Sequence, residues 1–359
     1  MIIEIKTKIH SILTMYFSIY YNKVMKAEIL KWNDETARKA KEIIQRWDIV
    51  AFPTETIYWL WADALNTPAV KKIFEVKGRP SSNPLIVHIG KKEQINGLWI
   101  VENKYQQQII DKLFPWPITL LLKKEPCIPE IVTQNPYVWI RMPSNRIANE
   151  FLIAVEAPIA APSANISWKP SPTSAPMVAD NVWDKINLII DWWDSDYWIE
   201  STVVKVDEEN GKWKIWILRP GFITKEDLET FFEGQDVEVE YTSKDKNMSP
   251  WTRFKHYSIP GEIIIVDKNN DIPQPINEPT AIIATEEWIS RENINSIKKE
   301  DTLILKRWTE SNLASCAHSL FDLYHKCETL GIKKVYIQRL PENWLGFAIM
   351  NRVKRSAEK

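Results

Sequence analysis

Glycine is scarce in this chain, with nine copies among 359 residues, where roughly 7% of the residues would be usual. Glycine is the residue that enters left-handed backbone conformations without strain, so a chain with so few copies has few places for tight turns or close backbone approaches. Tryptophan is correspondingly abundant, with 18 copies. Together the two residue types reach about the share that is usual for glycine alone.

The remaining composition is typical of a globular protein of about two domains. Hydrophobic residues make up 45% and charged residues 26%, which excludes disorder, collagen-like repeats and a coiled coil. The net charge of −1 lacks the basic excess of a nucleic-acid coat protein or a membrane-surface binder. Three cysteines, Cys127, Cys316 and Cys327, cannot form a disulfide framework and indicate a reducing compartment.

The first 24 residues contain an apolar run that is too short and too polar to span a membrane, and they offer no small-residue cleavage site. We expect residues 1–24 to be a non-native or disordered extension, with Met25 as the true start. No other segment resembles a membrane span, so we expect a cytoplasmic protein with no membrane partner.

Short apolar runs predict strands in the N-terminal two thirds of the chain, at 49–52, 85–89, 118–122, 137–141, 159–161, 188–191, 201–206 and 214–218. One helix is predicted to begin at Asn33, and a second to begin at Thr67 and end at Gly78. Strands outnumber the helices that could connect parallel neighbours, which favours a mixed α/β sheet. We assign residues 25–234 to this unit.

Residues 235–260 are polar and lack apolar periodicity, so we expect a linker or lid there. Beyond it, predicted strands at 262–266, 281–284, 302–305 and 335–337 and a helix over 311–330 indicate a small Rossmann-like α/β domain, residues 261–359. Cys316 and Cys327 would lie about 16 Å apart along that helix, too far to share a metal. No histidine has ligand spacing from another ligand, so we expect no metal held by protein side chains.

Polar and charged residues gather in three clusters: FPTETIYWLWADA (52–64), KGRPSSNPLIVHI (77–89) and APSANISWKPSPTSA (161–175). Arg141, IESTVV (199–204) and ILRPG (217–221) add to them. Hydroxyls and amides beside Lys and Arg at strand ends suit an anionic ligand such as a phosphate. Neither a GxxxxGK[ST] loop nor a GxGxxG motif is present, and no nucleophile–base pair stands out.

Each of these residues has a plain structural alternative when it is taken alone. Lys77 and Arg79 could complement a helix dipole, Arg141 and Arg219 could form surface ion pairs, and His88 could be a core histidine. The functional interpretation depends on their joint occurrence.

The ordered motifs KGRPSSNPLIVHI, FPTETIY, APSAN…SPT, IESTVV, ILRPG and SPWTRFKHY resemble those of the YrdC-like L-threonylcarbamoyl-AMP synthases. SPWTRFKHY and the C-terminal FAIMNRV are similar to the long, two-domain form. The resemblance implies a mixed twisted sheet with a concave groove, followed by the Rossmann-like domain. It also implies formation of threonylcarbamoyl-AMP and pyrophosphate from L-threonine, bicarbonate or CO2, and ATP, with Mg²⁺ held through the ATP phosphates. Downstream transferases would pass the threonylcarbamoyl group to tRNA. A weak contact between this protein and tRNA is compatible with that role.

The resemblance further implies the residues of the site. It implies catalytic roles for Lys77 and Arg79, threonine contacts for Thr56, His88, Arg141, Ala161 and Ser201, and ATP contacts for Arg79, Asn83, Tyr137, Ser163, Asn165, Ser171, Arg219 and Tyr257. Tyr137 stands where the family usually has a threonine. Two alternatives are an RNA- or ribosome-binding YrdC-like module without adenylation activity, and a carbamoyl-transfer enzyme with a related domain. The near-zero net charge disfavours the first, and the KHY linker and C-terminal domain disfavour the second.

Eleven tryptophans occupy positions where the resemblance leads us to expect glycine: Trp47, Trp59, Trp61, Trp116, Trp139, Trp168, Trp192, Trp193, Trp198, Trp251 and Trp344. A left-handed backbone costs a non-glycine residue roughly 1–2 kcal/mol, so eleven such replacements would exceed a typical total stability of about 5–15 kcal/mol. Some bacterial lineages read UGA as glycine, and a gene from one of them, translated with UGA as tryptophan, would show this exchange. We therefore expect glycine at these positions in the native protein.

Overall fold

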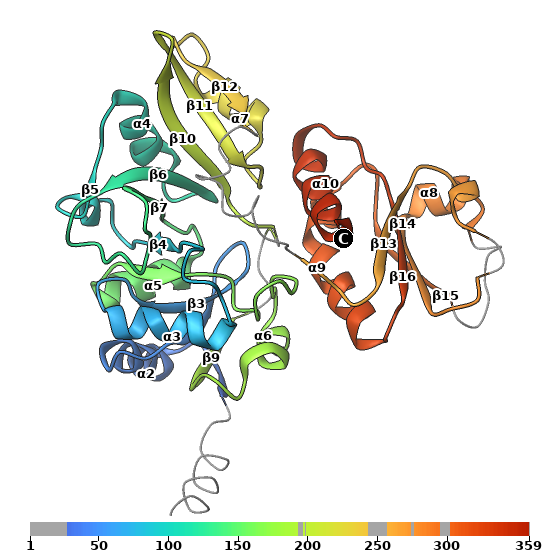
Figure 1. The fold of residues 1–359 in the computed structure, drawn as a ribbon, viewed down its shortest axis with the longest axis horizontal. Coiled ribbons are helices and arrows are strands. Elements are labelled where there is room, and N and C mark those ends of the chain that lie inside the picture. The colour runs from blue at the N-terminus through green and yellow to red at the C-terminus, as the bar shows by residue number, and fades with distance from the viewer. Residues whose placement is uncertain are drawn as a thin grey trace, which may run out of the picture.

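The computed structural model describes residues 27–192, 197, 199–242, 257–273, 276–294 and 302–358. The predicted extension 1–24 lies outside the described residues, as does most of the SPWTRFKHY segment. Figure 1 shows two α/β units, one ending with β12 (Glu238–Tyr241) and the other beginning with β13 (Glu262–Val266).

The larger unit is built on a sheet of 12 strands in the order β1-β9-β2-β3-β8-β4-β7-β6-β10-β11-β12, with β5 paired to β6. Its strands are β1 Glu28–Lys31, β2 Val50–Pro53, β3 Tyr58–Asp63, β4 Ile86–His88, β5 Trp99–Ile100, β6 Ile118–Lys124, β7 Tyr137–Arg141, β8 Ile159–Ala161, β9 Leu188–Asp191, β10 Thr202–Glu209, β11 Lys212–Arg219 and β12 Glu238–Tyr241. The sheet contains parallel pairs such as β4–β7 and antiparallel pairs such as β4–β8 and β6–β7. The predicted mixed α/β sheet is confirmed.

Helices cover both faces of this sheet, and side chains alternate between the two cores as the strand geometry requires. The helices are α2 Asp34–Gln45, α3 Thr67–Lys77, α4 Lys104–Leu113, α5 Arg146–Val155, α6 Ala175–Val182 and α7 Lys225–Phe231. Phe52 packs toward α2 and α5, where its ring stacks on that of Phe151 at 4.8 Å, whereas Ala51 faces the core that contains α3 and α4.

The predicted ends of the first two helices are confirmed. Asn33 caps α2 through a hydrogen bond from the Thr36 amide to its side chain, at 2.9 Å. Gly78 ends α3 in a left-handed conformation with φ +58°, which is the usual place for glycine after a helix.

The smaller unit has four parallel strands in the order β13-β16-β14-β15: β13 Glu262–Val266, β14 Thr280–Thr285, β15 Thr302–Trp308 and β16 Lys334–Gln338. Its helices are α8 Glu286–Arg291, α9 Leu313–Thr329 and α10 Trp344–Ala357. In Figure 1, α9 and α10 lie on the side of this sheet that faces the larger unit. The predicted second α/β unit is thus present, and its sheet is parallel.

The segment 235–260, expected to be a linker, is not irregular throughout. Residues Glu238–Tyr241 form β12, which pairs in parallel with β11 at the edge of the large sheet. This strand was not predicted because only one of its four residues, Val239, is buried, which leaves the apolar signal too short. Among the described residues, no helix is both long and apolar enough to cross a bilayer.

Candidate active site

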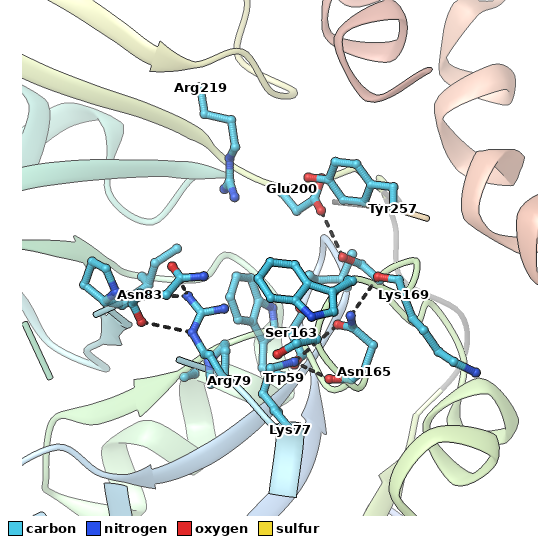
Figure 2. Close-up of a pocket in the computed structure, with 18 residues that line it drawn as sticks. Trp59, Lys77, Arg79, Asn83, Ser163, Asn165, Lys169, Glu200, Arg219 and Tyr257 are labelled. Carbon is cyan, nitrogen blue, oxygen red and sulfur yellow. Dashed lines mark hydrogen bonds between the residues drawn. The ribbon is translucent and has the colours of Figure 1, made fainter. Parts of the chain in front are cut away.

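A cavity of about 70 Å³ lies where the chain leaves α3, β8 and β11. Figure 2 shows Arg219 and Glu200 on one side of it and Lys77, Arg79 and Asn83 on the opposite side. Nine of the predicted site residues line it: Lys77, Arg79, Asn83, Ala161, Ser163, Asn165, Ser171, Arg219 and Tyr257. These residues are spread over three of the sequence motifs and the segment before β13, and the fold brings them together.

Lys77 is the last residue of α3 and is 1% exposed. Its Nζ donates to the carbonyl oxygen of Ser163 at 2.6 Å, to that of Asn165, and to Oδ1 of Asn165 at 3.5 Å. All three donors of the ammonium are therefore directed at the loop after β8. Burial, and secondly the charge of Arg79, lowers the pKa of Lys77 well below its usual value. Lys77 ties this loop to α3 at the edge of the cavity.

Arg79 organises the turn that follows α3. Its Nε donates to the carbonyl oxygen of Asn83 at 3.0 Å, and its Nη2 donates to Oδ1 of Asn83 at 2.7 Å and to the carbonyl oxygen of Pro84 at 2.8 Å. The guanidinium and the Asn83 amide are thereby fixed against each other beside the cavity. Burial lowers the pKa of Arg79 to about 9.

Glu200 is a buried carboxylate that links both units of the chain. Its Oε1 accepts from Oγ of Ser171 at 3.0 Å and its Oε2 from Nε of Arg352, in α10, at 3.1 Å. The Tyr257 hydroxyl also hydrogen-bonds the carboxylate. Burial alone would raise the pKa of Glu200, but the charges of Arg352 and Arg219 and these hydrogen bonds lower it overall, so the group stays ionised.

Tyr257 closes one side of the cavity in a strained conformation, with φ +58°. Its ring stacks on Phe321 of α9 at 5.1 Å, and the side chain is 8% exposed. Burial and the nearby Glu200 raise the pKa of Tyr257 above its usual value, so the hydroxyl stays protonated and donates. The rest of the predicted lid lies outside the described residues.

Arg219 ends β11 and holds the start of β10. Its Nε and Nη2 donate to the carbonyl oxygen of Ser201 at 3.1 and 2.8 Å, and Nη2 also donates to Oγ of Ser201 at 3.1 Å. Oγ of Ser201 lies 2.7 Å from Oγ1 of Thr119, in β6. Burial lowers the pKa of Arg219 to about 10.

Arg141, at the end of β7, belongs to a second polar cluster behind the cavity. Its Nη2 donates to Oε1 of Glu55 at 2.5 Å and to Oγ1 of Thr56 at 2.8 Å. In the sheet it pairs in register with His88 of β4. Nε and Nη1 of Arg141 and both ring nitrogens of His88 are buried and have no hydrogen-bond partner among the described residues.

The indole of Trp59 separates this second cluster from the cavity. It lines the cavity, its ring centroid is 4.9 Å from that of His88, and Cζ of Arg141 lies 5.3 Å from it. Its Nε1 donates to Oγ1 of Thr54 at 2.9 Å. Thr56, His88 and Arg141 are thus assembled with one another but do not reach the cavity.

Two outcomes differ from the sequence prediction. Tyr137 begins β7, at the opposite end of that strand from Arg141, and does not line the cavity. The sequence analysis also missed Glu55, Glu200 and Arg352. Glu55 and Glu200 stand inside quoted motifs, where a carboxylate among hydroxyls was the available signal. Arg352 lies 152 residues from its partner, and no local pattern marks it.

Among the described residues, no group of three or more His, Cys, Asp or Glu side chains is placed to hold a metal ion. Cys127 is exposed, whereas Cys316 and Cys327 are buried in α9, and all three are free thiols.

Two family models match nearly the whole chain between them. The model described as telomere recombination, for Sua5, YciO and YrdC proteins, matches residues 42–221. The model described as threonylcarbamoyl-AMP synthase, C-terminal domain, matches residues 223–358.

Individual relatives match over similar lengths. The chain is 35% identical over 325 residues to the threonylcarbamoyl-AMP synthase of Pyrococcus abyssi, covering 89% of this chain and 93% of the relative. It is 31% identical over 338 residues to the Bacillus subtilis protein of the same name, covering 91% and 94%. The crystal structure of P. abyssi Sua5 complexed with L-threonine superposes with a TM-score of 0.79 at 30% identity, covering 93% of this chain and 97% of that one. The chain therefore belongs to the threonylcarbamoyl-AMP synthase family, in the form that carries the family's C-terminal domain.

Proposed function

We propose that this protein forms L-threonylcarbamoyl-AMP and pyrophosphate from L-threonine, bicarbonate or CO2, and ATP. The observation that carries the proposal is the cavity in which Arg79, Arg219, three serines and two asparagines converge. Arginines beside neutral donors suit a polyphosphate, because the guanidinium supplies charge and the amides and hydroxyls fix orientation. The family relationship over both units of the chain supports the same reaction.

The reaction needs no protein nucleophile. The threonine nitrogen attacks the carbon of CO2, forming an N–C bond and releasing a proton, to give a carbamate. A carbamate oxygen then attacks the α-phosphorus of ATP, and the bond from that phosphorus to the bridging oxygen breaks, so that pyrophosphate leaves. Both steps depend on positioning and charge neutralisation. A cavity of fixed cations and amides offers both.

We assign the charge neutralisation to Arg79 and Arg219, and the shape of the pocket to Lys77. The Lys77 ammonium is fully used in holding the loop at 163–165, so it acts as a positioning residue for Ser163 and Asn165. Both arginines are desolvated, and this lowers their pKa. A bound triphosphate would offset that cost, which favours an anion over a neutral ligand.

Mg²⁺ would enter this site with the nucleotide. Magnesium in proteins usually takes one or two carboxylates plus substrate phosphates. The carboxylate that lines the cavity, Glu200, is already held by Ser171 and Arg352. The residues present therefore fit an ion that is coordinated by the triphosphate and neutralises its charge.

We assign L-threonine to the cluster of Thr56, His88 and Arg141, with the Ala161 backbone and Ser201 beside it. Arg141 keeps two buried nitrogens without a partner among the described residues, and these suit the carboxylate of an amino acid. We expect the product to pass to a threonylcarbamoyl-transferase that modifies tRNA in the cytoplasm. The alternative, RNA binding without adenylation, is not favoured, because the cavity is small, at about 70 Å³, and Tyr257 and Glu200 stand in its wall.

Pyrophosphate release tests the proposal directly. Purified protein is given ATP, Mg²⁺, L-threonine and bicarbonate, and each substrate is then omitted in turn. We expect pyrophosphate only when all are present. Release that continues without threonine would contradict the assignment, and salt-sensitive tRNA binding without any release would favour the RNA-binding alternative.

A further inference from the structure

The tryptophans with left-handed backbones are an anomaly that packing does not explain. Among the described residues, seven non-glycine residues have positive φ, and three of them are tryptophan: Trp47 at 64°, Trp168 at 79° and Trp344 at 49°. Asparagine tolerates such angles and accounts for two of the others, but a bulky residue there is a genuine outlier.

Trp47 occupies a helix-ending position that glycine usually fills. Its amide donates to the carbonyl oxygen of Ile44 at 3.0 Å, and the amide of Asp48 donates to that of Ile43 at 3.1 Å, which closes the end of α2. This pattern places a left-handed residue directly after the helix, usually glycine. The indole is 58% exposed, so burial does not compensate the strain.

Trp168 occupies the glycine position of a tight turn. The amide of Lys169 donates to the carbonyl oxygen of Ile166 at 3.2 Å, so Trp168 is the third residue of a four-residue turn with φ +79°. A positive φ at this position defines a type II turn, which requires glycine or asparagine there. The indole of Trp168 also lines the candidate active site.

At Trp59 the anomaly lies in the space that the indole occupies and not in the backbone conformation. Trp59 is 2% exposed and lies against His88 and Arg141, which carry four buried nitrogens without hydrogen-bond partners among the described residues. Buried polar groups in native proteins nearly always have partners. The cavity beside the indole has about 70 Å³, against roughly 300–1,000 Å³ for ordinary ligand sites. The indole thus fills the space from which a polar ligand could reach these nitrogens.

We infer that residues 47, 59 and 168 are glycine in the protein that its own cell makes, because UGA is read there as glycine. The inference unites three observations of different kinds: nine glycines against 18 tryptophans, left-handed backbones at Trp47 and Trp168, and an indole that buries His88 and Arg141. Glycine at residue 59 joins the cluster of Thr56, His88 and Arg141 to the nucleotide cavity. The ligand of the opened space is a small amino acid whose carboxylate meets Arg141, a consequence that rests on the proposed function.

Peptide mass spectrometry of the protein purified from the organism that carries the gene tests the residue identities. We expect glycine at residues 47, 59 and 168. Tryptophan at any of the three would overturn the inference.

Variants of the chain that carries tryptophan at these positions test the backbone strain separately. Trp47→Gly and Trp168→Gly should each raise the midpoint temperature of thermal unfolding. The control is Leu60→Gly, in β3, which removes a fully buried side chain from a regular strand. This control should lower the midpoint temperature. A lower midpoint in both tryptophan variants would overturn the argument from strain.

Calorimetric titration with L-threonine tests the opened subsite. We expect Trp59→Gly to bind at least tenfold more tightly than the chain with Trp59, and Trp59→Ala serves as a second variant if the glycine variant is unstable. An unchanged affinity for L-threonine in a folded variant would overturn the amino-acid subsite. The glycine assignment would then be decided by the mass spectra alone. Pyrophosphate release by the protein from its own cell tests the proposed function independently, so the two failures are distinguishable.

Discussion

The Nε atom of Arg352, in the last helix, donates over 3.1 Å to Oε2 of Glu200, in the wall of the candidate active-site cavity. Both side chains are almost completely buried. A second nitrogen of Arg352 donates to the carbonyl oxygen of Pro220, next to Arg219. The smaller unit therefore contributes a charge that the active-site wall requires, in addition to packing against the larger unit.

Replacing Arg352 with methionine should destabilise the protein by about 3–5 kcal/mol, because it leaves the Glu200 carboxylate buried without its cation. ATP binding should weaken as well, since Ser171 and Tyr257 depend on the same carboxylate. Urea unfolding and calorimetric titration with ATP measure the two effects. The control is Lys169→Gln, which breaks the half-exposed ion pair with Glu328 between the same two units and should change stability by less than about 1 kcal/mol. Equal losses of unfolding free energy in the two variants would contradict a special role for the buried pair.

Gly221→Ala should destabilise the protein although its backbone is not in the left-handed region. A methyl group on Gly221 would lie 2.4 Å from the carbonyl oxygen of Glu200 and from the amide nitrogen of Thr202, and neither backbone atom can move away cheaply. We expect a loss of roughly 1–3 kcal/mol in unfolding free energy. Gly78→Asn is the comparison, because the space around Gly78 is open and asparagine tolerates a positive φ. A harmless Gly221→Ala would show that the two strand ends can separate.

His88 should make the protein sensitive to acid. Burial, and secondly the charge of Arg141, holds the pKa of His88 well below its usual value of 6.5. The unfolded chain takes up a proton there as the pH falls through about 6.5, whereas the folded chain does not. The contribution of His88 to the unfolding free energy is therefore complete above about pH 6.5. Below that pH the unfolding free energy decreases by up to roughly 1.4 kcal/mol per pH unit. His88→Gln should flatten that part of the curve, which urea unfolding between about pH 7 and pH 5 measures; an unchanged slope would assign the sensitivity to other groups.

Arg219→Lys should raise the KM for ATP roughly ten- to hundredfold, the value of one charge-assisted hydrogen bond. Lysine cannot reproduce the fork that holds the carbonyl and hydroxyl oxygens of Ser201. Pyrophosphate release at increasing ATP concentration gives the KM. Arg146→Lys, on an exposed helical face with Glu150, should leave it unchanged. A normal KM in both variants would remove Arg219 from the nucleotide site.

The sequence predicted those elements whose signal is local. The strands at Tyr137–Arg141 and Leu188–Asp191 match their predicted bounds because each is a short apolar run that ends at a charged residue. The strand β3 was not predicted because its residues were interpreted as part of the polar cluster at 52–64.

The polar site was predictable only in part, because only the residues within a local motif carry a signal in the sequence. Lys77 and Asn165 could be named from their motifs, but the bonds between them join residues 88 positions apart and follow from the fold. The separation between the Arg141 cluster and the cavity could not be read from any motif, because it depends on which way the indole of Trp59 points.

The pairing of Glu200 with Arg352 also sets an order of events during synthesis. The two residues are 152 positions apart, and a ribosome adding about 5–20 residues per second needs roughly 8–30 seconds to make the intervening chain. The larger unit is complete once β12 has been made, early in that interval, yet its carboxylate at residue 200 has no cation to meet until α10 follows. A nascent chain can therefore form its large sheet early, but the wall of the candidate cavity is completed only once α10 has been made, so ribosome-bound intermediates should fold before they can bind ATP firmly.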